Sequence, residues 1–188
     1  MSCKKKLFKT IMYLVLFSFI IGFVKVEYFL SFLYEDMTNS ARVMSYITLS
    51  LGTVFFYFLI IISIFFSYST IEFLEMGKGF AIDNFYKSIS KFIYTLFFNE
   101  ISKLIITLFT FESQTIYYEE EFNNILIKNT LWLNLIEFSD IIFIGIGSCL
   151  YLFSFISIDK KVKPLNVVIS ALPLVISFFI FRYVNGVN

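Results

Sequence analysis

Five long apolar runs, separated by short polar breaks, account for most of this chain and decide which solvent it folds in. Hydrophobic residues make up 59% of the 188 residues, the aromatic fraction is 21%, and the mean hydropathy is +0.83. A soluble domain of this size could not hide so much apolar surface, and large exposed patches cause aggregation. We therefore predict that residues 1–188 form a single membrane domain, and that this domain contacts the lipid bilayer.

The apolar runs predict α-helices and not the strands of a barrel. Crossing about 30 Å of hydrocarbon takes roughly 20 helical residues, whereas barrel strands are shorter and alternate polar with apolar residues. A helix also satisfies its own backbone hydrogen bonds in lipid, which overrides the strand preference of Phe, Ile, Val and Tyr. We predict an all-α polytopic membrane protein with five transmembrane helices, at 7–34, 44–66, 85–111, 131–158 and 165–183.

The basic residues predict an orientation for these five helices. Lysines cluster before the first run, around the start of the third run and between the last two runs, whereas the other breaks are mainly acidic. With the N-terminus cytoplasmic and the C-terminus outside, ten basic residues lie in the cytoplasm and three outside, as the positive-inside rule requires. The start resembles a signal peptide, but no small-x-small cleavage site follows. We therefore predict an uncleaved first helix and a multi-pass protein of the cell membrane.

Five charged side chains inside the predicted helices form a candidate intramembrane polar cluster. Charges at this depth are expensive and need a partner, water or a nearby interface. Glu100 and Lys103 are three residues apart and can neutralise each other, whereas Glu137 and Asp140 share a face with no cation on their own helix. Lys25 can alternatively extend its long side chain outward to the interface.

The pair of carboxylates has two interpretations. In the first, Glu137 and Asp140 face Lys103 across the bundle and form a cation or proton site. In the second, both carboxylates lie one or two turns below the outer surface, where they are hydrated or hydrogen-bonded, because structural ion pairs also arise without a functional role.

The run 131–158 also carries small and polar residues. Gly145 and Gly147 predict a smooth surface for close helix packing, and Asn134 and Ser139 can add hydrogen bonds between helices. Trp132 is predicted to anchor the outer end of this helix at the interface. The preceding segment 114–129 is predicted to form a short interfacial helix.

The residues predict no catalytic site and no cofactor or metal site. The chain has no His, which removes the commonest general base and metal ligand, and it has two Cys. No phosphate-binding glycine motif is present, and a net charge of +1 does not indicate a nucleic-acid partner. We therefore expect a protein that is not an enzyme.

Two segments resemble the Ypt-interacting-protein (Yip) family of five-helix membrane proteins. Residues 77–87, GKGFAIDNFYK, are similar to the family's glycine-containing cytoplasmic turn before a polar-started third helix. Residues 131–185 are similar to its closing pair of helices, with an acidic residue before Phe138, a Gly-x-Gly helix and a lysine-rich turn. The short basic N-terminus is more similar to the bacterial type. The resemblance implies a non-enzymatic protein that acts through other membrane proteins beside export machinery.

These observations together predict an accessory subunit that assembles or regulates a membrane export complex driven by an ATP-dependent transporter. The predicted partner is another membrane protein, bound through lipid-facing helix surface. Two alternatives remain open: a self-protection (immunity) protein against membrane-active peptides, and a small transporter or channel subunit that uses the intramembrane charges.

Overall fold

The computed structural model describes residues 3–32, 35–75, 82–111, 129–159 and 162–185, and within them the chain is almost entirely helical. The helices are α1 (Cys3–Leu30), α2 (Glu35–Leu74), α3 (Ile82–Thr110), α5 (Thr130–Ile158) and α6 (Pro164–Asn185). The predicted all-α class is confirmed for these residues. Most of the predicted interfacial helix at 114–129 lies outside the described residues.

Four of these helices, α1, α2, α3 and α5, are long and apolar enough to cross a membrane. This agrees with the prediction of a membrane protein. The observed α2 is longer than the predicted span 44–66, because helical hydrogen bonding continues through the polar residues on both sides of the apolar run.

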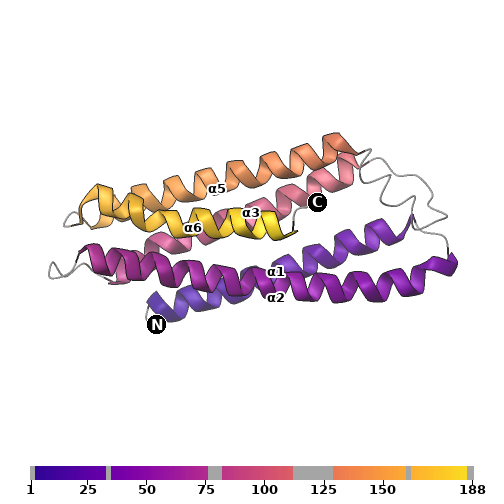
Figure 1. The fold of residues 1–188 in the computed structure, drawn as a ribbon, viewed down its shortest axis with the longest axis horizontal. Helices are drawn as coiled ribbons and strands as arrows, with labels where there is room; N and C mark the ends of the chain where they lie inside the picture. Colours follow the sequence, from indigo (N-terminus) through magenta and orange to yellow (C-terminus); the bar gives the residue numbers. More distant parts are fainter. Residues whose placement is uncertain (1–2, 33–34, 76–81, 112–128, 160–161, 186–188) are drawn as a thin grey trace.

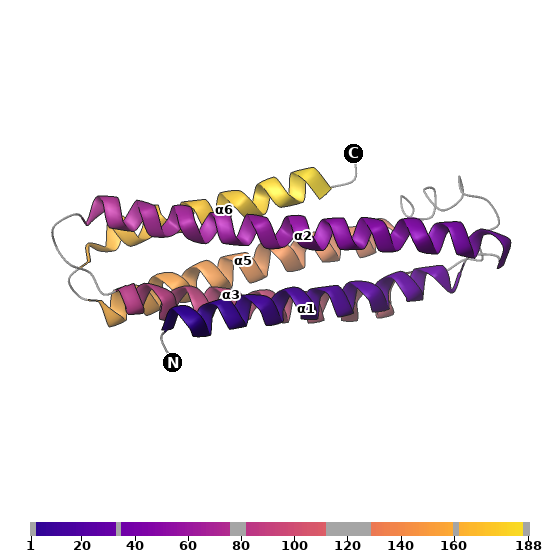
Figure 2. The ribbon, with the colours of Figure 1, turned by 90° about the horizontal axis from the view of Figure 1, so that it is seen from below.

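The helices lie roughly along one common axis and form an elongated bundle (Figures 1 and 2). The main contacts join α1 to α2, α2 to α6, α6 to α5, α5 to α3 and α3 to α1, so that the helices form a closed ring. All five described helices contribute buried residues to the core, and its largest fully buried side chains include Phe85 of α3 and Tyr151 and Phe155 of α5.

Polar contacts hold the first turn of α6 against the end of α2. Glu75 is 2% exposed, and its carboxylate accepts a 3.1 Å hydrogen bond from the backbone N–H of Lys163 and another from the side chain of Asn166. A carboxylate at a helix N-terminus is favourable because it satisfies free N–H groups and complements the helix dipole. The start of α6 is thereby placed beside the last residue of α2.

The ring is incomplete at its other end because α6 is the shortest helix (Figures 1 and 2). Asn166 contacts the backbone of Leu74, and helices rise about 1.5 Å per residue, so the end of α6 lies level with about residue 55 of α2. Consistent with this, residues 42–59 of α2 include no buried side chain. In this half, α2 contacts α1, for example through the stacked rings of Tyr46 and Phe23.

Candidate functional site

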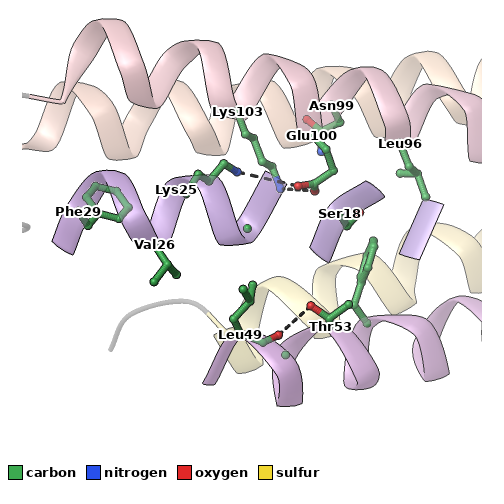
Figure 3. A pocket seen from close by; sticks show the side chains of 13 residues that line it. Ser18, Lys25, Val26, Phe29, Leu49, Thr53, Leu96, Asn99, Glu100 and Lys103 are labelled. Atoms are coloured by element: carbon green, nitrogen blue, oxygen red, sulfur yellow. Dashed lines mark hydrogen bonds and ion pairs between the residues drawn. The ribbon is translucent and has the colours of Figure 1, made fainter. Parts of the chain in front are cut away.

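Four of the five predicted intramembrane charges lie together where α1, α3 and α5 meet. Lys103 Nζ lies 2.5 Å from Asp140 Oδ1 and 3.6 Å from Glu100 Oε1. Lys25 Nζ lies 3.9 Å from Glu100 Oε2 (Figure 3). Each of these side chains is between 13% and 17% exposed. We call these four residues the charge network.

Two neutral side chains extend the charge network between α3 and α5. Asn99 donates from Nδ2 to Asp140 Oδ1 at 2.7 Å, and Ser139 donates from Oγ to Asn99 Oδ1 at 2.9 Å. Both are buried. Asp140 therefore accepts from an ammonium and an amide, which offsets part of the cost of burying its charge.

Trp132 and the aromatic residues near it form a cluster between the charge network and the adjacent end of the bundle. The Trp132 indole donates to Thr107 Oγ1 at 3.1 Å, and its ring lies edge-on to Phe29 and Phe111. Seven residues separate Lys103 from the end of α3, and ten separate the start of α5 from Asp140. The network therefore lies about 10–15 Å inside this end of the bundle.

Glu137, the fifth predicted charge, is not part of the network in the structure. Its side chain is exposed on α5, as is that of Asn134. Side chains three residues apart on a helix point in directions that differ by about 60° around the helix axis. Asp140 therefore faces α3, whereas Glu137 lies toward the outside of the bundle. The interpretation that both carboxylates face Lys103 is therefore corrected: Asp140 does so, and Glu137 does not.

Lys25 lies in the predicted polar cluster and does not reach outward. Its ammonium group turns inward to Glu100 on α3 (Figure 3). The attraction of a carboxylate across a low-dielectric interior outweighs the gain from reaching a distant interface.

A cavity of about 320 Å³ lies beside the charge network, between α1, α2 and α3. Lys25, Glu100 and Lys103 line its polar side (Figure 3). The apolar side includes Phe29 and Phe56. On each of the three helices, the residues that line the cavity are three or four apart in sequence, so they share one face of that helix.

The two glycines of α5 have different surroundings. A methyl group built on Gly147 would collide with the side chains of Thr95 and Phe92, so this glycine permits close contact with α3. At Gly145 the same methyl group would meet open space. The predicted packing role therefore applies to Gly147, whereas Gly145 faces away from its neighbours.

The hydrogen bond between helices that was predicted for Ser139 is confirmed, since its hydroxyl donates to Asn99 of α3. The place of Asn99 in the site was not predicted, although this residue directly precedes Glu100 and forms a polar pair with it inside an apolar run. The cavity gave no such signal, because Gly22 and Gly52 acquire their role only when α1 and α2 are brought together.

The arrangement can hold charge in a membrane and present a cation and an anion side by side to a cavity. Among the described residues, no group of three or more Cys, Asp or Glu side chains could hold a metal ion.

No family model, curated protein or solved structure matches this chain. The resemblance of residues 77–87 and 131–185 to the Yip family therefore stays a prediction.

Proposed function

We propose that this chain is a five-span protein of the cell membrane, with its N-terminus in the cytoplasm and its C-terminus outside. The 22 residues of α6 extend about 33 Å, which is enough to serve as the fifth span. Successive helices along the chain run in opposite directions (Figure 1), which also supports this topology, because α1, α3 and α6, whose starts are rich in lysine, then all begin at one end of the bundle.

This topology predicts the activity of a fused reporter. Alkaline phosphatase, which is active only outside the cytoplasm, is expected to be active when fused after Asn188 and inactive when fused after residue 161. The two fusion points differ by one membrane crossing, so they control for expression and reporter folding. Phosphatase activity confined to the shorter fusion would overturn the proposed orientation.

Within this topology, the chain acts as a non-enzymatic accessory subunit that binds another membrane protein laterally, and the uncovered half of α2 supports this role. Only 6% of the most apolar window of α2 is buried, compared with 28% to 33% in the other three long helices. Apolar side chains at least 50% exposed recur at alternating intervals of three and four residues: Met44, Ile47, Leu51, Val54 and Phe58. This spacing is typical of a seam that packs against a parallel or antiparallel helix.

The partner is a membrane export complex, as the resemblance to bacterial Yip proteins implies. Purification in mild detergent is expected to recover subunits of such a complex with the chain. Substituting Leu51→Trp and Val54→Trp is expected to lower this recovery by about tenfold or more, because bulky rings would prevent close helix contact. The amount of co-purified partner is measured by quantitative mass spectrometry.

Two tryptophans on the exposed face of α5, Ile146→Trp and Leu150→Trp, are the matched control and should leave recovery unchanged. Equal loss in both pairs would show a general effect of added bulk. Recovery of the chain alone, under conditions that keep other membrane complexes intact, would overturn the proposal. Co-purification of a membrane-active peptide alone would indicate self-protection instead.

The charge network favours a second candidate, a small transporter or channel subunit. Lys103 and Asp140 form a largely buried pair beside a cavity, and charges within spans often mark transport pathways. Asp140→Asn keeps the shape of the side chain and an acceptor oxygen but removes the charge. If this variant remains abundant and folded while a transport activity is lost, the second candidate is supported over the accessory subunit.

A further inference from the structure

Lys25 and Glu100 present opposite charges to the cavity without a direct hydrogen bond. Their nearest atoms are 3.9 Å apart, beyond the usual limit of about 3.2 Å for an N–H to oxygen bond. An ammonium group has three donors, and within the described part of the chain the Lys25 side chain makes no hydrogen bond. The pair therefore has unused hydrogen-bonding capacity directed at the cavity.

The other members of the network hold one another more closely. Lys103 lies 2.5 Å from Asp140, and Asn99 donates to the same carboxylate. In contrast, Ser18 lines the cavity, and its buried hydroxyl has no hydrogen-bond partner among the described residues. The cavity thus offers the Lys25 ammonium and the Ser18 hydroxyl, neither of which has a hydrogen bond among the described residues, beside the Glu100 carboxylate, whose nearest cation is Lys103 at 3.6 Å.

The rest of the cavity wall is apolar and contains two glycines. Gly22 and Gly52 lie on the facing sides of α1 and α2, and a methyl group built on Gly52 would meet open space. Phe29, Leu49 and Phe56 supply apolar surface. A ligand in this space would bury a small apolar group while its polar group meets α1 and α3.

Charge balance selects the class of ligand. The two ammonium groups and two carboxylates of the network sum to zero. A ligand with a net charge would leave one charge uncompensated at low dielectric, which is costly inside a membrane. A zwitterion adds no net charge and can satisfy both Lys25 and Glu100.

We propose that the cavity binds a small zwitterion that carries an ammonium group, an acidic oxygen group and an apolar part. The acidic oxygens accept from Lys25 and Ser18, the ammonium donates to Glu100, and the apolar part lies against Phe29 and Phe56. A volume of about 320 Å³ is at the lower end for ligand cavities, which sets the size of the bound group. A free apolar amino acid and the headgroup of phosphatidylethanolamine share this chemistry.

Binding to the purified full chain in mild detergent tests the proposal and separates the two sources. Leucine is titrated by calorimetry, and didecanoyl phosphatidylethanolamine is titrated by native mass spectrometry. Isoamylamine and 4-methylpentanoate, which keep one charged group each, are the comparison ligands for leucine. Saturable binding of leucine, of the lipid or of both supports the site, and the comparison ligands should bind at least about tenfold more weakly than leucine.

Three variants connect binding to the cavity. Lys25→Met is expected to weaken binding at least about tenfold, the loss that follows removal of a charge-assisted hydrogen bond. The double variant Lys25→Met with Glu100→Gln removes both charges together, keeps the Lys103 pair with Asp140, and should abolish binding in a neutral, folded protein. Gly52→Leu should abolish binding by filling the cavity, and Gly145→Leu, at an open position on α5, is its matched control.

The absence of saturable binding by either zwitterion to the folded protein would overturn the proposal. The same conclusion follows if the comparison ligands bind as tightly as leucine. Unchanged binding in both the double variant and Gly52→Leu would place the ligand elsewhere and would equally overturn it.

Discussion

Replacing Asp140 by Ala is expected to lower the free energy of unfolding by about 3–5 kcal/mol, because the change leaves the largely buried Lys103 without its closest counter-charge. Asn99 loses its acceptor at the same time. The remaining carboxylate, Glu100, is shared with Lys25 and lies farther from Lys103. Unfolding by sodium dodecyl sulfate in mixed micelles, followed by far-ultraviolet circular dichroism, measures the effect.

Glu137→Ala is the matched control, since Glu137 is an acidic residue on the same helix but is exposed. Its effect should be much smaller than that of Asp140→Ala. Adding Lys103→Met to Asp140→Ala should recover part of the lost stability, because removing both charges costs less than leaving one buried charge unpaired. Equal effects of the two alanine substitutions would contradict the role assigned to Asp140.

Replacing Gly147 by Leu is expected to destabilise the protein by at least about 3 kcal/mol, because the new side chain would overpack the contact between α3 and α5. The first added carbon already collides with Thr95 and Phe92, and Thr95 is buried. Neither helix can retreat freely, since Asn99 and Ser139 hydrogen-bond across the same contact. The same detergent unfolding experiment gives the change in stability.

Gly145→Leu provides the comparison for this prediction. It makes the same chemical change two residues away, at a position with open space around it. The variant should unfold close to wild type, with a small gain from the better helix propensity of Leu. Comparable losses at both positions would show that the effect comes from the helix itself and not from packing against α3.

Much of the fold could be predicted because its causes lie in local sequence. The apolar runs set where helices form, and the observed α3 and α5 begin and end within a few residues of the predicted spans. The pairing of Glu100 with Lys103 was also predictable, because residues three apart on a helix are neighbours whatever the fold.

The partners of other charges were not predictable, because they depend on how helices are turned toward one another. Periodicity placed Glu137 and Asp140 on one face, but the rotation of α5 against α3 decided that Asp140 alone meets Lys103. Lys25 similarly meets Glu100 only because α1 packs beside α3.

By itself, the sequence determined that this protein is helical and that its solvent is lipid, since both follow from the length and composition of each run. Only the tertiary structure decided where the cavity lies and which half of α2 remains uncovered. Both features depend on the distances between helices that are far apart in the sequence. Most of the lipid-facing surface is apolar whichever way the helices pack. Hydropathy therefore carries little information about these distances.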